Sequence, residues 1–490
     1  MWRLFLIRGI WKTMISMHTL DRNHIRFDRR LCFSVAAVAI MLFLMFGRLH
    51  HYILQSLYES NYYHLGIPAL VAVYVAVRGF RDGTGMKILL LYVLWAVLSR
   101  IPNGDRFLVI EGDYLIDLST MILLFAPGVL LQRRQKDRLF DVTAGVIVLF
   151  YLAMAAVCIY TATTRTFVEN PIDYRGIGYP TPSETRLYFL SYHWNETAGQ
   201  FLIAFGLCLV LFFRTKNTFL RAGLIVAALA DFVTVGLTVS RNGQTCACLV
   251  LGLMFGILAV NRMRKQLLWK RIAVFCAVCL LGTVLFYQLF EPARFALWNV
   301  YRIRVEAEAA VVNTVNPEEK QTFTGKLSAE TLELSEEGPS YTADNRGYLE
   351  SGRKEIFWSA LKSLQMEPKR LLIGSGYYHV MDISHTLIRE QAKHFHNTFL
   401  QVVNEFGLIG LALVIWFFFW TIKCAFRMIF QPEGNISTGD QMLTLLPVAL
   451  MGFFMLEVGI FKIVDMANFN FTFYYFACGM LAGAVRGRSL

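Results

Sequence analysis

Long apolar blocks alternate with short polar connections along most of the chain. The blocks run for roughly 17 to 25 residues, the length that a helix needs to cross about 30 Å of hydrocarbon. They lack the two-residue alternation of lipid-facing barrel strands. The pattern predicts an all-α polytopic membrane protein with about twelve spans, at about 31–47, 63–77, 88–100, 113–131, 141–163, 188–213, 219–239, 245–260, 272–290, 398–421, 443–464 and 468–485.

One long hydrophilic stretch, at about residues 291–397, interrupts this pattern between the ninth and tenth spans. It separates an N-terminal membrane region of about nine spans (1–290) from a C-terminal membrane region of about three (398–490). From Arg304 on, the loop is acidic and poor in aromatic residues, which predicts a flexible or loosely folded insertion. Residues 350–368 then place apolar side chains at helical spacing and predict an amphipathic helix that ends at Pro368.

Composition and charge fit a membrane protein rather than a nucleic-acid-binding one. Of the 490 residues, 56% are hydrophobic and 17% charged, and the net charge is +12. The basic residues fall in every second connection, as in QRRQKDR (132–138) and NRMRKQLLWKR (261–271). The positive-inside rule therefore predicts cytoplasmic termini and places the large loop outside. The chain has nine cysteines, almost all in or beside predicted spans and none in the large loop, so we expect no disulfide framework.

Three unusual polar positions mark the outer face. Arg241 lies at the external end of the seventh span, where the positive-inside rule disfavours cations. Arg353 falls in the first turn of the predicted amphipathic helix, where a cation opposes the helix dipole. His396 and Asn397 directly precede the tenth span. Two cations and one base at the membrane surface would suit a lipid-linked diphosphate.

Helical geometry favours an inward direction for the histidine. In a helix that starts near His396, one face would carry Leu400, Val403, Gly407 and Gly410. Glycines on that face would let a neighbouring helix pack closely, so His396 would point into the bundle. The alternative for His396 is an interfacial residue bonded to a backbone carbonyl, and the alternative for Arg241 is snorkelling into outer headgroups.

Other polar residues are weaker candidates. Gly374 and Gly376 could let backbone amides approach a phosphate, although an ordinary turn explains them as well. Asp231 lies in mid-span, and we expect it to pair with a neighbouring helix. His193, Asn195 and Glu196 lie near the external start of the sixth span, where a structural role is the simpler expectation.

No metal or other cofactor is expected. Four of the ten histidines lie between residues 379 and 396, but their spacing is irregular and no carboxylate or cysteine pattern accompanies them. Cys276 and Cys279 have the CxxC spacing within an apolar helix that has no second pair.

The arrangement resembles the O-antigen ligase and O-antigen polymerase family of the bacterial envelope. His396, Asn397, Gly407 and Gly410 fit the family pattern H[NSQ]-x9-GxxG. Further similar segments are TVSRNG (238–243), SGRKEIFW (351–358) and PKRLLIGSGYYHV (368–380), so that the resemblance covers about 220–260 and 345–420. The long acidic insertion before Asp344 departs from the pattern.

The resemblance implies a GT-C-like glycosyltransferase of the bacterial plasma membrane. Such an enzyme would move a glycan from undecaprenyl diphosphate to a hydroxyl of a glycan or of a lipid-anchored glycan acceptor, on the extracytoplasmic face. By family analogy His396 would be the essential loop histidine, and Arg241 and Arg353 would engage the donor diphosphate. Asn397, Gly374 and Gly376 would help to bind substrate.

The residue types fit metal-independent transfer with inversion. Arginine can bind two phosphate oxygens with its cationic fork, and a neutral imidazole, with an ordinary pKa of about 6.5, can accept the proton of a sugar hydroxyl. The motifs do not separate ligase from polymerase. A transporter or flippase is the alternative from another class; its site should lie near the midplane on broken helices, whereas the unusual polar residues here gather at one surface. A structural subunit would tolerate alanine at His396 and Arg241.

Overall fold

The computed structural model describes most of the membrane-embedded part of the chain. The described residues are 28–47, parts of 67–74, 83–103, 112–168, 176–179, 186–189, 194–315, parts of 357–364, 368–376, 395, 397–430, 436–455 and 469–486. Arg353, His396 and His193 lie outside them.

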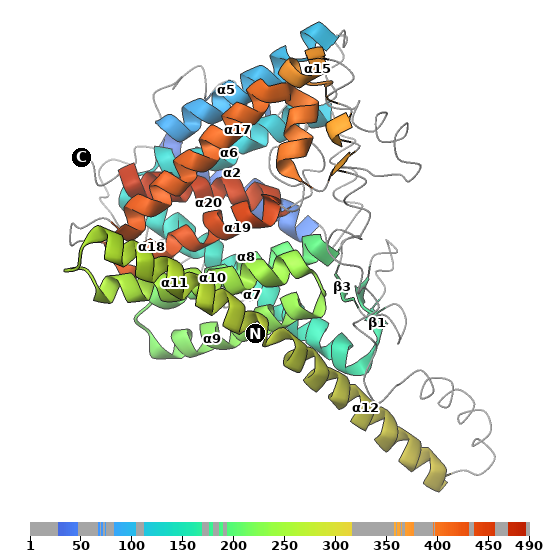
Figure 1. Ribbon diagram of the computed structural model, residues 1–490. Coiled ribbons are helices and arrows are strands. Elements are labelled where there is room, and N and C mark those ends of the chain that lie inside the picture. The colour runs from blue at the N-terminus through green and yellow to red at the C-terminus, as the bar shows by residue number, and fades with distance from the viewer. Residues whose placement is uncertain are drawn as a thin grey trace.

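The described part is built almost entirely of helices (Figure 1). In chain order the elements are α2 (Arg29–Gly47), α5 (Thr84–Leu98), η2 (Ile101–Asn103), α6 (Gly112–Leu130), α7 (Arg133–Thr164), β1 (Phe167–Val168), β2 (Ile177–Gly178), β3 (Tyr188–Phe189), α8 (Trp194–Arg214), α9 (Thr218–Leu237), α10 (Arg241–Arg262), α11 (Leu268–Tyr287), α12 (Phe290–Val315), α15 (Pro368–Ile373), α17 (Thr398–Phe430), α18 (Thr438–Gln441), η4 (Met442–Thr444), α19 (Leu445–Met455) and α20 (Phe469–Arg486).

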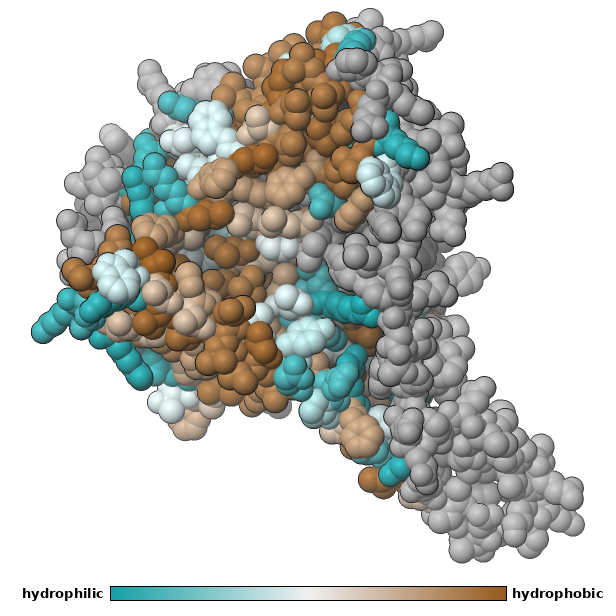
Figure 2. Space-filling view, in the orientation of Figure 1, coloured by the Kyte–Doolittle hydropathy of each residue, from teal (hydrophilic) through white to brown (hydrophobic). Residues whose placement is uncertain are grey.

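Within the described ranges, eight helical segments are long and apolar enough to cross a membrane, and two shorter apolar helices, Thr84–Leu98 and Ile116–Leu130, accompany them. Large apolar side chains point outward from these segments, such as Phe219 at 91% and Leu280 at 68% exposure. Figure 2 shows apolar side chains covering much of the face that α17, α10 and α11 present. A surface of this kind faces lipid, which confirms a polytopic α-helical membrane protein. The count of twelve spans stays a prediction.

Charged side chains join the helix ends at one side of the bundle. Arg214, at the end of α8, contacts Asp141 and Asp137 of α7 at 2.8 and 3.3 Å and Asp440 of α18 at 3.3 Å. Arg214 and Asp440 are largely shielded, with side-chain exposures of 13% and 12%, so these ion pairs are screened less than surface pairs. The start of α7, the end of α8 and the start of α18 therefore lie at the same membrane side.

The start of α2 belongs to that side too. Gln135 of α7 donates to the carboxylate of Asp28 at 2.9 Å, and this hydrogen bond lowers the pKa of Asp28. The connections before α2, before α7 and after α8 are rich in Arg and Lys, and the positive-inside rule predicts that such connections are cytoplasmic.

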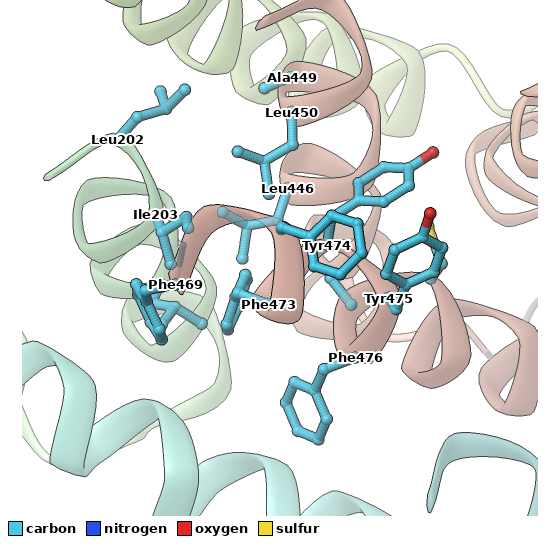
Figure 3. Close-up of a cluster of buried hydrophobic side chains, with 14 of the residues drawn as sticks. Leu202, Ile203, Leu446, Ala449, Leu450, Phe469, Phe473, Tyr474, Tyr475 and Phe476 are labelled. Atoms are coloured by element: carbon cyan, nitrogen blue, oxygen red, sulfur yellow. The ribbon is translucent and has the colours of Figure 1, made fainter. Parts of the chain in front are cut away.

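The interior between α8, α19 and α20 is packed with aliphatic and aromatic side chains (Figure 3). All of those drawn and labelled are at most 1% exposed: Leu202, Ile203, Leu446, Ala449, Leu450, Phe469, Phe473, Tyr474, Tyr475 and Phe476. This density fixes the relative positions of the three helices, because a close-packed interior does not deform continuously.

Glycines allow α6 and α20 to approach each other closely. A Cβ on Gly479 would overlap the carbonyl oxygen of Phe125, and a Cβ on Gly483 would overlap that of Gly128. Small residues at such crossings are how membrane helices gain van der Waals contact, since lipid offers no hydrophobic drive for their association.

One expectation for the large loop was wrong. Residues from Arg304 to Val315 were expected to be loosely folded but continue α12, which extends away from the bundle in Figure 1. The stacked rings of Phe232 and Phe290, with centroids 4.4 Å apart, anchor the start of α12 on α9. Pro368 is the first residue of a separate short helix, α15, where its missing N–H is tolerated.

A three-stranded antiparallel sheet, in the order β1-β2-β3, follows α7. It lies beside α12 through Arg165, whose guanidinium lies 4.2 Å from the ring centroid of Tyr179 and 4.7 Å from that of Trp298. The cation between two rings connects the end of α7, the sheet and α12.

The glycine contact between α6 and α20 gives a stability prediction. Gly479→Ala should destabilise the folded protein by about 1–3 kcal/mol, because the added methyl group forces two backbones apart. The measurement is the thermal unfolding midpoint in detergent. Gly145→Ala is the matched control, since a Cβ there meets nothing within 4 Å. Equal midpoints for the two variants would contradict the prediction.

Candidate active site

The segment that follows His396, the predicted catalytic histidine, is a helix that folds back on itself. Gly407 has φ 68° and ψ −170°, which interrupts α17. The rings of Phe399 and Phe418 have centroids only 5.7 Å apart, whereas nineteen residues of straight helix would separate them by about 28 Å. Residues 398–406 therefore pack against residues 408–418. The expected continuous face from His396 through Gly407 to Gly410 was wrong, because the helix does not continue through Gly407.

Other parts of the protein bind the carbonyl oxygens exposed by this break. Of residues 404–406, the first carbonyl accepts from the amide and the hydroxyl of Ser375, each at 2.8 Å. The second accepts from the amide of Gly376 at 3.1 Å, and the third from the indole of Trp95 at 2.8 Å. In a membrane, such backbone groups must be paired within the protein. The break is thus a docking point for the turn that follows α15.

The docking of the turn requires glycine on both sides of the contact. Gly374 and Gly407 both have positive φ, at 79° and 68°. A Cβ on Gly374 would overlap the Glu405 carbonyl, and a Cβ on Gly407 would overlap that of Leu372. Gly374 and Gly376 therefore have a structural role at α17, and their expected contact with substrate stays a prediction.

Asn397 forms the start of α17. Its side-chain oxygen accepts from the amide of Leu400 at 3.0 Å, as an N-cap does. The next residue, Thr398, donates its hydroxyl to the carbonyl of Phe454 at the end of α19, at 2.6 Å. The sequence position directly before this cap is His396, so the cap and the threonine fix the chain on one side of the histidine.

Arg241 is the first residue of α10 and is exposed, rather than ending the preceding span as expected. Ser240 caps this helix by accepting from the amide of Gly243. Asn242 donates to the carbonyl of Phe453 at 2.7 Å. Val239 has φ 53°, a left-handed conformation that is unfavourable for a β-branched residue and is found where the surroundings impose it.

The starts of α10 and α17 are joined through α19. Asn242 and Thr398 bond to the carbonyls of two consecutive residues, Phe453 and Phe454. Arg241 and Asn397, far apart in sequence, are thereby brought to the same end of the bundle. This juxtaposition is the main geometric feature of the site.

Two more helix starts join this end. The Asn195 side chain of α8 accepts from the Ser240 hydroxyl at 2.7 Å, and Asn470 of α20 donates to the carbonyl of Glu196 at 3.0 Å. The starts of α8, α10, α17 and α20 therefore surround one region. Each helix start carries partial positive charge, which favours an anion.

The structure places some predicted site residues and leaves others outside its described part. Arg241 and Asn397 lie at the joined helix starts, and Gly374 and Gly376 lie against the break in α17. Phe395, which precedes His396, is buried against Ala360 and Leu400. Ala360 belongs to the predicted amphipathic helix, so that element contacts the histidine loop.

Several residues of the site were missed from the sequence. Asn242, Thr398 and Asn470 each lie in the first two positions of a helix and each donates a side-chain hydrogen bond to a neighbouring backbone carbonyl. The available signal was a polar residue at the start of an otherwise apolar span. Asp231, expected to pair across helices, accepts from the thiol of Cys208 at 3.7 Å.

In the described ranges, no group of three His, Cys, Asp or Glu side chains is arranged so that it could hold a metal ion. The positive charge around the described site comes instead from Arg241 and from helix dipoles.

Comparison with protein families identifies the central part of the chain. Residues 226–415 match the family model described as O-antigen ligase. The chain carries an O-antigen ligase domain. This domain begins within α9 and ends within α17, and it includes Arg241, Asn397 and the turn after α15. No curated protein matches the chain.

The match confirms the resemblance inferred from the sequence motifs. Together with the apolar helices, it supports a membrane protein whose central part is of O-antigen ligase type, a family of polysaccharide biosynthesis. The substrates of such a protein are a lipid-linked glycan and its acceptor.

The break in α17 gives a second prediction. Gly407→Ala should loosen the docking of residues 368–376, because alanine is strained at this φ by about 1–2 kcal/mol and its methyl group overlaps the Leu372 backbone. Hydrogen exchange of the amides of Ser375 and Gly376 should become about tenfold faster. In Gly223→Ala, where a Cβ meets nothing within 4 Å, it should not change. Unchanged exchange in Gly407→Ala would contradict the docking role.

Proposed function

We propose that the protein is a bacterial plasma-membrane glycosyltransferase that moves a glycan from undecaprenyl diphosphate to an acceptor hydroxyl. The observation that carries this proposal is the junction at α19. Two consecutive carbonyls hold the helix start with Arg241 and the helix start that follows His396. A cation for the donor and a base for the acceptor are then available at one site.

Arg241 and Arg353 would bind the donor diphosphate. A guanidinium offers two parallel N–H donors that match phosphate oxygens, and it keeps its charge at every physiological pH. Arg353 precedes Ala360 by seven residues, two turns of a helix, so both fall on one face of the predicted amphipathic helix. Because Ala360 contacts Phe395, that face would be directed toward the histidine loop. The surrounding helix starts add further attraction for the diphosphate.

His396 would act as the general base. Its imidazole accepts the proton of the acceptor hydroxyl while the oxygen attacks the anomeric carbon of the donor glycan. The bond between that carbon and the diphosphate oxygen breaks, and undecaprenyl diphosphate leaves with the electron pair. Attack from the face opposite the leaving group inverts the anomeric configuration, and the arginines stabilise the negative charge that develops on the diphosphate.

The alternative, a lipid-linked glycan transporter, would use the break in α17 as a midplane binding site. Transporter sites of this kind expose unwound backbone carbonyls to substrate or ion. Here the carbonyls of residues 404–406 are bonded to Ser375, Gly376 and Trp95. The break therefore supports docking of a loop, which favours the enzyme.

Residues 408–430 are long enough, at about 35 Å, to cross the hydrocarbon without residues 398–406. The first part of α17 is thus available to shape the site at one membrane surface. The connections rich in Arg and Lys lie at the opposite end of the bundle, which supports an extracytoplasmic location for the site.

An assay in membranes with undecaprenyl-diphosphate-linked glycan tests the proposal. His396→Ala should lower the rate by about 10² to 10⁴, the usual contribution of a general base, and Arg241→Ala should lower it by about tenfold or more. A chelator should leave the wild type unchanged, because the proposed charge stabilisation comes from arginine. The product decides between polymerase, which lengthens the glycan on its lipid carrier, and ligase, which transfers it to another acceptor.

Arg304→Ala is the matched control, since Arg304 is an exposed cation of α12, the helix that extends away from the bundle. Its activity should equal that of the wild type. Full activity in both His396→Ala and Arg241→Ala would overturn the proposal. Movement of intact lipid-linked glycan across vesicles without any transfer would favour the transporter.

A further inference from the structure

A buried polar pair lies within the folded-back part of α17. The side-chain amide of Gln401 donates to the carboxylate of Glu405 at 2.5 Å, and its oxygen accepts from the backbone amide of Phe395 at 3.1 Å. Gln401 and Glu405 are each only 1% exposed. The result is a continuous connection from the carboxylate to the residue before His396.

The spacing of this pair explains why the connection runs toward the loop. Residues 401 and 405 are one helical turn apart, so their side chains lie on the same face. Side chains of a helix lean toward its N-terminus, which directs Glu405 toward Gln401 and Gln401 toward the loop.

The far end of the connection is fixed. The backbone carbonyl of Glu405 accepts from the amide of Gly376, and that of its neighbour Asn404 accepts from Ser375. The break in α17 thus holds Glu405 against the turn after α15. The carboxylate is attached to a rigid point and not to a helix that slides freely.

The near end is fixed as well. The Phe395 ring is buried against Ala360 and Leu400, and the Phe395 amide is bonded to Gln401. On the other side of His396, Asn397 caps the helix. Both chain neighbours of the histidine are therefore held.

Burial of an amide and a carboxylate is costly, and apolar side chains would fill the same volume at lower cost. A buried hydrogen bond of this kind requires one relative position of its donor and acceptor, whereas an apolar interior tolerates several. A base in catalysis must be held to within about 0.5 Å of its productive position. The loop that precedes α17 is the element in which such precision would matter.

We propose that Gln401 and Glu405 are positioning residues that hold the backbone at Phe395 and so orient His396 toward the acceptor hydroxyl. This inference rests on the proposed glycosyl transfer. It assigns the pair no contact with substrate: Glu405 acts on Gln401, Gln401 on the loop, and the loop on the imidazole.

Exchanging the two side chains tests the connection. Gln401→Glu places two carboxyl groups together and should break the pair. The double variant Gln401→Glu with Glu405→Gln restores one carboxylate, which accepts from Phe395, and one amide, which donates to it. Hydrogen exchange of the Phe395 backbone amide should become at least about tenfold faster in the single variant. In the double variant its rate should return to within about threefold of the wild-type rate.

Kinetics with the lipid-linked donor supply the functional readout. Gln401→Glu should lower kcat by about tenfold or more and leave KM for the donor within about twofold, because the base is displaced while the diphosphate site is unchanged. The double variant should recover kcat to within about threefold. Thr143→Val is the control: Thr143 is a buried α7 residue whose hydroxyl bonds to Leu139 of its own helix, so its loss should change neither quantity.

If Gln401→Glu does not fold, Glu405→Gln is the second variant, since an amide keeps the shape and can still accept from Gln401. Its kcat and the rate of hydrogen exchange at the Phe395 amide should lie between those of the wild type and those expected for Gln401→Glu. Unchanged Phe395 exchange in these variants would overturn the inference, and so would faster exchange with wild-type kcat. A wild type without transfer activity would overturn the proposed function, while the exchange data would still decide whether the pair holds the loop.

Discussion

The pairing of backbone groups at the break in α17 is the constraint on which the site depends. A helix that turns back at Gly407 exposes three successive carbonyl oxygens, and lipid offers them no donor. Only a segment with amides in the right places can meet them, and the turn at Ser375 and Gly376 does so, together with the Trp95 indole. Residues 368–376 are therefore attached to the membrane domain because the helix is broken there.

The same break gives the histidine loop its position. A straight helix from Thr398 to Phe430 would carry its start far from α19, whereas the fold-back brings Thr398 to the carbonyl of Phe454. That carbonyl is next to the one which holds Asn242, and Asn242 follows Arg241. One turn in the backbone thus determines whether the cation and the base of the proposed reaction can share a site.

Sequence reasoning succeeded for features that depend only on the order of residues along the chain. Apolar blocks of membrane length predicted the helices, alternating Arg and Lys predicted which ends lie together, and the ion pairs of Arg214 agree with that alternation. It failed at Gly407, because a glycine within an unbroken apolar run has the same local pattern whether it serves helix packing or a reversal. The positive φ of Gly407 and its contact with the turn at Ser375 and Gly376 depend on tertiary structure, which the local sequence does not reveal. The regular α12 was missed for a similar reason: the acidic composition from Arg304 on predicts solvation, but it does not forbid a helix that starts on a firm anchor at Phe290.

The distribution of buried polar groups separates two uses of polarity in this bundle. Asp231 lies in mid-span beside the thiol of Cys208, an isolated contact that joins two helices. At the site end, polar side chains instead bond to backbone at the starts of several helices, and Gln401 with Glu405 extends this network to the histidine loop. The first arrangement stabilises a helix pair; the second fixes where each helix begins. Because the proposed reactive groups lie at helix starts, errors in those starts would become errors in catalytic distance. The concentration of polar contacts there follows from that requirement.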